Sequence, residues 1–163
     1  MNRKKLGIIG GAVLVVGALG WFYVKPNYVD AKPKPVYTEE QIAQAPRPTV
    51  TLEERVLNLK APATAPNYVK AVIALEFADP DHKWMGLKGE GLAGKNAAFA
   101  AELKPEMHRI WDVITTVVGA RSVDQVATSE GRETLKAELV AAINHEMHSE
   151  KVETVYFVTF ITQ

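Results

Sequence analysis

The chain has 163 residues, with 19 acidic and 19 basic side chains and no cysteine. The missing thiols exclude disulfide bonds, thiolate chemistry and the lipid attachment of a lipoprotein. Beyond Pro48 the chain carries 12 basic and 16 acidic residues, a net charge of −4, so this part lacks the basic face that nucleic-acid binding requires.

The first predicted element is an uncharged apolar stretch from Leu6 to Val24, which follows a basic tail at residues 1–5. At ~1.5 Å per residue it covers ~28 Å, enough to cross the ~30 Å hydrocarbon core of a lipid bilayer once. A signal peptide cut before Trp21 is the alternative. The length of the stretch and the aromatic cluster at residues 21–23 favour a retained single-pass helix, with the N-terminus in the cytoplasm and everything after Lys25 outside it.

The segment from Lys25 to Pro48 contains five prolines and no glycine. Its isolated apolar residues show no sustained period, which predicts an extended linker rather than a core. Thr38 and Gln41 fit a capping box, so one short helix is expected inside this linker.

From Thr49 to Gln163 the pattern predicts one extracytoplasmic α+β domain in which helices pack on a sheet. Strands are expected at Arg55 to Leu59 and at Asn67 to Ala78, because alternate residues of the second stretch are apolar. Helices are expected at Glu106 to Val118, at Ser122 to Ala127, and from a Ser129 cap onward for about nineteen residues. The apolar stripe of the last helix comprises Leu135, Leu139, Ile143 and Met147.

The final stretch, Val152 to Gln163, is a predicted strand that is apolar on both faces. Strict alternation places Val155, Phe157 and Ile161 on one face and Tyr156, Val158 and Phe160 on the other. Such a strand is either central in its sheet or covered by helices on one side and by a neighbouring chain on the other. Tyr156, Val158 and Phe160 are therefore the candidate oligomer or packing residues, with an ordinary core role as the plainer interpretation.

The glycine-rich segment Gly86 to Gly94 leads into Lys95 and Asn96, and the stretch Gly89 to Asn96 resembles a phosphate-binding loop. Asn96 occupies the position at which such a loop needs Ser or Thr for Mg²⁺. The segment also begins about ten residues beyond the end of its strand. We expect a flexible connection here and no nucleotide binding.

No catalytic, cofactor or metal site is expected. His145 and His148 stand three residues apart near a helix end, but no third ligand is near them in sequence. His82 and His108 are expected to be solvated, and Asp79 and Asp81 flank a proline and are typical of a turn. The serines form no GxSxG motif.

Three fragments resemble a known family: Gly131 to Leu139, the pair Ile143-Asn144, and Val152 to Gln163. Together they resemble the helix and terminal strand of the flagellar basal-body-associated FliL family. Arg132 stands where that family usually has lysine, and Val158 where it usually has threonine. The resemblance extends upstream to about Arg55, with Asp79 to Lys104 diverged.

The resemblance implies a single-pass inner (cytoplasmic) membrane protein of the flagellar basal body. It further implies contact with the stator proteins MotA/MotB, a domain similar to the stomatin-type (SPFH) fold, and homo-oligomeric rings. The implied role is non-enzymatic: support of stator engagement, torque, swimming or swarming. The residues alone leave another role open, namely a membrane-anchored adaptor or sensor that binds a different envelope protein.

Overall fold

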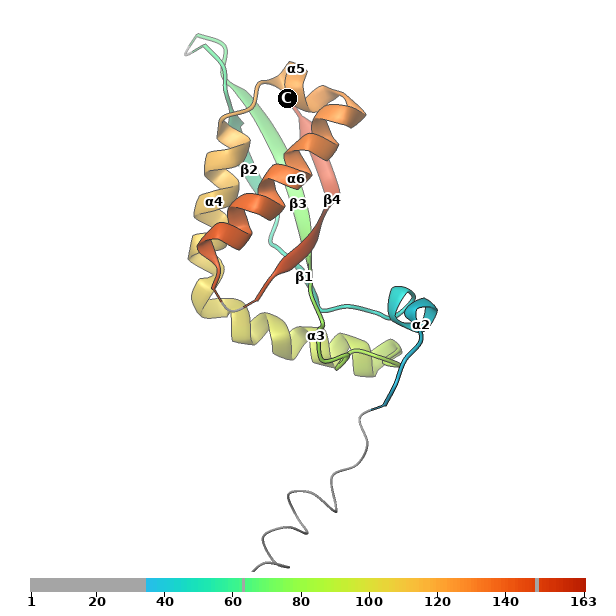
Figure 1. The fold of residues 1–163 in the computed structure, drawn as a ribbon. Coiled ribbons are helices and arrows are strands. Elements are labelled where there is room, and N and C mark those ends of the chain that lie inside the picture. Colours follow the sequence, from blue (N-terminus) through green and yellow to red (C-terminus); the bar gives the residue numbers. More distant parts are fainter. Residues whose placement is uncertain (1–34, 63, 149) are drawn as a thin grey trace, which may run out of the picture. The chain divides into compact units, whose positions relative to one another are not determined.

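A computed structural model of the chain describes residues 35–62, 64–148 and 150–163. The apolar stretch Leu6 to Val24 lies outside these ranges, and within them no helix combines the length and apolar character needed to cross a bilayer. Residues from Glu39 to Gln163 form one compact unit. Its elements in chain order (Figure 1) are α2 (Glu39–Ala43), β1 (Thr49–Thr51), β2 (Arg55–Leu59), β3 (Asn67–Phe77), α3 (Gly89–Leu103), the 3-10 turn η2 (Lys104–Glu106), α4 (Met107–Gly119), α5 (Val123–Ala127), α6 (Ser129–Glu146) and β4 (Val152–Thr162).

The sheet is antiparallel and is built around β3. Along one edge of β3, β2 pairs with its first half and β1 with its second half. β4 pairs with β3 along the other edge, from the Val69–Thr162 pair to the Phe77–Val152 pair. β3 is therefore the central strand, as its apolar alternation favours.

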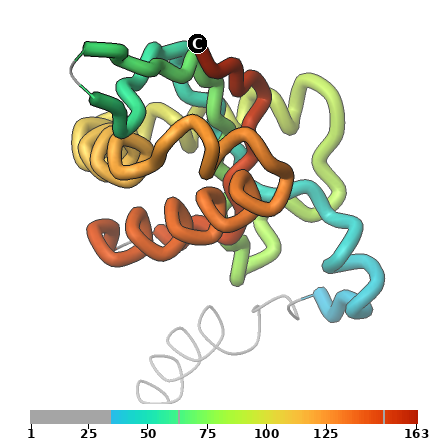
Figure 2. Tube along the Cα trace, turned by 90° about the horizontal axis from the view of Figure 1, so that it is seen from above, coloured from blue at the N-terminus to red at the C-terminus, as the bar shows by residue number. Residues whose placement is uncertain are grey.

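Helices α4 and α6 cover one face of this sheet, and the two views agree on their position (Figures 1 and 2). α4 packs beside β2 and α6 beside β4. The core lies between the two layers, where alternate β3 side chains meet apolar side chains of both helices and none is more than 1% exposed: Val69, Ala71, Ile73, Leu75 and Phe77 from β3, Ile110, Ile114 and Val118 from α4, and Leu135, Leu139 and Ile143 from α6. The predicted α+β class and the predicted helix stripe are confirmed.

Most of the predicted elements are found within one or two residues of their expected bounds. The short helix expected near Thr38 is α2. Ser122 caps α5 in a capping box: its hydroxyl accepts from the Gln125 amide, and its own amide donates to the Gln125 side chain. The prediction that Ser129 caps the long helix is wrong. Thr128 is the cap, since its Oγ1 accepts from the Gly131 amide at 3.0 Å, and Ser129 is the first helical residue.

The flexible connection predicted over the glycine-rich segment is also wrong, because Gly89 to Leu103 form the helix α3. Only Phe99 and Leu103 of this helix are buried, so its apolar residues are too few to show a helical period. Gly86, in the turn that precedes the helix, and Gly89, its first residue, have φ values of +74° and +52°, a conformation in which glycine carries no steric penalty.

The apolar composition of β4 left two alternatives, a central strand or a strand covered by helices on one side and by a neighbouring chain on the other, and the first of these is wrong. β4 is an edge strand, and among the described residues no strand pairs with its outer side. A register shift places one extra residue, Val158, between the Val72–Thr159 and Ile73–Phe157 pairs. This bulge turns Phe157 and Phe160 toward the same face of the sheet, the face that carries the helices. Strict alternation therefore assigned Phe160 and Ile161 to the wrong faces.

Candidate interaction surface

The side chains of Lys95 and Asn96, which follow the glycine-rich segment, are engaged in structural contacts. Lys95 Nζ donates to the Lys83 carbonyl at 2.7 Å and lies 4.6 Å from the centre of the Trp84 ring. Asn96 Oδ1 accepts from Trp84 Nε1 at 2.8 Å and from the Thr49 amide at 3.3 Å. Asn96 thus joins α3 to the start of β1, and the segment is a helix rather than a loop of free amides around an anion.

We expect Asn96→Ala to lower the free energy of unfolding by about 1–3 kcal/mol, because the indole N–H of Trp84 and the Thr49 amide lose their acceptor. Lys95→Ala, the adjacent position, should change it by less, within about 0.5–1 kcal/mol, since this lysine lies at the surface. Urea unfolding of the two variants measures the difference. A larger loss for Lys95→Ala would contradict this assignment of roles.

The two histidines near the end of α6 do not form a metal site with the residues described. The Nδ1 atom of His145 lies 3.4 Å from a carboxylate oxygen of Glu146, and that of His148 lies 3.1 Å from the Glu146 carbonyl. Across residues 35–62, 64–148 and 150–163, no three potential metal ligands cluster. His108 is exposed on α4, and His82 has a φ of +54° in the turn after β3.

Asp79 forms the turn that follows β3, as its place before a proline predicts. Its carboxylate accepts from the amides of Lys83 and Trp84 at 2.9 and 2.8 Å. The carboxylate of Asp81 raises the pKa of the exposed Lys83 ammonium through a hydrogen bond and an ion pair. Both acids therefore order the turn.

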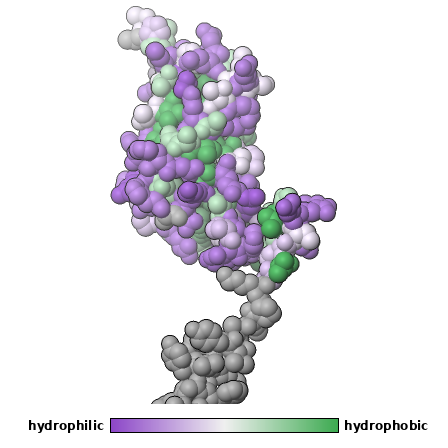
Figure 3. Space-filling model, in the orientation of Figure 1, coloured by the Kyte–Doolittle hydropathy of each residue, from purple (hydrophilic) through white to green (hydrophobic). Residues whose placement is uncertain are grey.

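The sheet face opposite the helices carries a cluster of exposed apolar side chains, which we call the open face: Val56, Tyr68, Tyr156, Val158 and Ile161. Apart from Val36, these are all the large apolar residues that are exposed in the described chain. Pairing in the sheet aligns Val56, Lys70 and Ile161 in one row across β2, β3 and β4. By contrast, the surface over α4 and α6 is largely hydrophilic (Figure 3).

Two of the three candidate residues of the last strand belong to the open face. Val158 is 62% exposed and Tyr156 is 43% exposed. The third, Phe160, is half-buried on the helix side and lies against Phe157, with ring centres 4.4 Å apart. Ile161, 51% exposed, takes the place on the open face that alternation assigned to Phe160. The sequence offered no signal for the bulge that causes this exchange.

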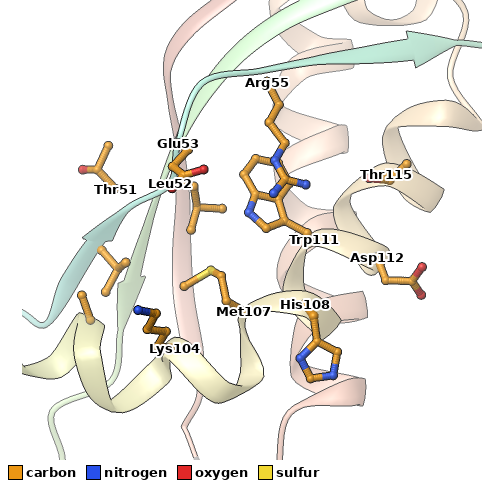
Figure 4. Close-up of a pocket in the computed structure, with 12 residues that line it drawn as sticks. Thr51, Leu52, Glu53, Arg55, Lys104, Met107, His108, Trp111, Asp112 and Thr115 are labelled. Carbon is orange, nitrogen blue, oxygen red and sulfur yellow. The ribbon is translucent and has the colours of Figure 1, made fainter.

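A groove of about 760 Å³ runs along the opposite edge of the sheet, between β1–β2 and the helices (Figure 4). We call it the edge groove. Leu52 and Trp111 are buried beside it, and Met107 is half-buried. The Arg55 guanidinium lies 4.0 Å from the centre of the Trp111 ring, so it covers the indole. Sequence reasoning missed this groove, because Arg55 and Trp111 are 56 positions apart.

Comparison with known proteins gives a specific match for this fold. The family model described as flagellar basal body-associated protein FliL matches residues 49–163. The chain is also 29% identical over 110 residues to the "Flagellar protein FliL" of Aquifex aeolicus strain VF5, a match that covers 64% of this chain and 68% of that protein. Because the family model covers well over half of its residues, this chain belongs to the FliL family of flagellar basal-body-associated proteins.

Proposed function

We propose that this protein is a membrane-anchored, non-enzymatic accessory of the flagellar motor that associates with the stator proteins MotA/MotB. In this proposal Leu6 to Val24 anchors it in the inner membrane, with the basic tail in the cytoplasm and the Thr49 to Gln163 domain outside. It supports stator engagement, and through it torque, swimming or swarming. Membership of a family associated with the flagellar basal body supports the setting.

The observation that carries the proposal is the open face. An exposed apolar cluster on one face of a sheet is the usual sign of a protein–protein contact, because leaving such surface in water is unfavourable. Several of the polar groups discussed above have structural roles: the Asp79 carboxylate orders a turn, the Lys95 ammonium donates to a backbone carbonyl, and the His145 ring lies beside Glu146. Docking, rather than chemistry, is what this surface offers.

We propose that the contact at the open face includes a second copy of the chain, so that the protein forms homo-oligomers of ring type. Tyr156 and Val158 lie on β4, whose outer edge is unpaired among the described residues. An apolar edge strand of eleven residues is prone to pair with another chain unless it is covered. A similarity of the domain to the stomatin-type fold, which also builds rings, is part of this proposal.

The test combines Tyr156→Lys with Val158→Lys, because lysine on an edge strand is how natural sheets prevent edge contacts. We expect the double variant to fold, to lose cross-linked oligomers and co-purified stator subunits in membranes, and to leave cells with filaments that rotate poorly. Thr116→Lys combined with Ala97→Lys adds the same charge at exposed helical positions and should behave as the wild type. Normal oligomers and normal swimming in the double strand variant would refute the proposal. Oligomers without stator subunits would instead favour an adaptor for another envelope protein.

A further inference from the structure

The edge groove lies beside backbone groups of β1 that have no hydrogen-bond partner within the part of the chain that the structure describes. In the antiparallel pairing of β1 with β3, the Leu52 amide points inward and donates to the Ile73 carbonyl at 2.8 Å. The Thr49 amide points outward, where it donates to Asn96 on α3. Since successive residues of a strand alternate, Thr51 also directs its amide and carbonyl outward. No described residue accepts from or donates to these two groups of Thr51.

The other wall of the groove is formed by η2 and the first turns of α4. Met107 and Trp111 provide its apolar surface. A strand edge that faces a helix across an apolar groove can accept an extended peptide as an additional strand, with alternate side chains directed into the groove. The main chain of such a peptide would pair with Thr51.

The groove also contains two cations, Arg55 and Lys104, without an ion-pair partner among the described residues. Arg55 lies over Trp111, and neither Arg55 nor Lys104 forms an ion pair with any residue in the described ranges. Two carboxylates also line the groove: Glu53, which likewise forms no ion pair in the described ranges, and Asp112, which projects away from the strand edge (Figure 4). A guanidinium held against an aromatic ring keeps N–H donors available along its edge, and these can bind a carboxylate of a ligand.

We infer that the edge groove is a docking site for an extended, acidic segment of a partner protein. The segment adds to the sheet at Thr51, places an apolar side chain against Met107 and Trp111, and pairs its carboxylates with Arg55 and Lys104. The groove borders β1 and β2, whereas the predicted oligomer contact lies along β4 on the other edge of β3. A negative result for one of these two proposed contacts therefore leaves the other proposal unaffected.

The experiment measures fluorescence anisotropy of labelled heptapeptides titrated with the full-length chain in detergent. The probe alternates valine and glutamate. Its controls are the same peptide with lysine for glutamate, and a version N-methylated at alternate residues, which cannot form the strand hydrogen bonds. We expect the acidic peptide to bind at least about tenfold more tightly than either control. The lysine peptide loses the charge-assisted hydrogen bonds to the cations, and the N-methylated peptide loses the main-chain hydrogen bonds.

Two variants separate the contributions of charge and main chain. Arg55→Glu should weaken binding of the acidic peptide by about tenfold or more and favour the lysine peptide. Thr51→Pro removes only an outward amide of an edge strand, which sheets tolerate, and should weaken the acidic peptide while leaving the thermal midpoint nearly unchanged. Lys88→Glu makes the same kind of charge reversal at an exposed position outside the groove and should bind as the wild type.

Equal binding of the three peptides, or no binding at millimolar concentration, would overturn the inference. So would acidic-peptide binding that is unaffected by Arg55→Glu. If Thr51→Pro does not fold, the N-methylated peptide gives the main-chain readout by itself. Self-association without peptide that Arg55→Glu abolishes would mean that a second copy occupies the groove, and would also overturn the proposed partner class.

Discussion

Gly131→Ala is expected to destabilise the domain by about 3 kcal/mol or more, and it is among the most damaging single substitutions we anticipate. A Cβ at Gly131 would lie 1.7 Å from the Gln125 carbonyl oxygen and 2.9 Å from its carbonyl carbon. Because both are backbone atoms of α5, no side chain can move aside to relieve the clash. The Gly131 amide also donates to the Thr128 cap, so displacing the first turn of α6 would disturb that bond as well.

The matched control for this substitution is Gly94→Ala in the interior of α3. No atom lies within 4 Å of a Cβ built there. Alanine is the better helix former, so this variant should be more stable than the wild type by about 0.5–1 kcal/mol. Urea unfolding of both variants measures the contrast. Equal stability of the two alanine variants would show that the junction between α5 and α6 adapts more readily than its geometry indicates.

Asn144→Ala is expected to cost about 2–4 kcal/mol. The side-chain amide of Asn144, near the end of α6, donates to the Val152 carbonyl and accepts from the Val152 amide, both at 2.8 Å. Val152 is the first residue of β4 and is buried. Without Asn144, both of its backbone groups lose their partner in a site that excludes water.

Asn144→Asp refines this test, because the carboxylate can still accept from the Val152 amide but cannot donate to its carbonyl at neutral pH. Its loss of stability should exceed that of the exposed neighbour His145→Ala, which we expect to be within about 0.5 kcal/mol. Thermal unfolding followed by circular dichroism measures the series. Stability of Asn144→Ala at the wild-type level would mean that β4 is positioned without this connection.

The sequence predicted the elements whose burial has a clear period. β3 repeats an apolar residue at every second position and α6 at every fourth, and both patterns reflect a single buried side. α3 was not predicted, because it buries only Phe99 and Leu103 and so shows no helical period. Its glycines then favoured a flexible connection over a helix. The cap of α6 was misplaced by one residue since Thr128 and Ser129 are both good caps, and only backbone geometry separates them.

The candidate surface was predictable in kind but not in detail. The apolar composition of β4 predicted apolar side chains on both faces, and the structure places one set in the core and leaves the other exposed. One extra residue at Val158 then reversed the faces for everything that follows it, and a bulge of this sort depends on tertiary pairing rather than on local sequence. The edge groove needs residues from β1, β2 and α4 together, so no local pattern could reveal it.

The pairing of β3 with β4 also has a consequence for biosynthesis. It joins segments about 75 residues apart, with α3, α4, α5 and α6 in between. Ladders of such long sequence separation form slowly, whereas helices can form as soon as they emerge from the ribosome. At roughly 5 to 20 residues per second, β3 waits about 4 to 15 s for its partner to be translated. During this interval the edge of β3 that β4 later occupies has unpaired backbone groups, which are open to a chaperone or to another chain.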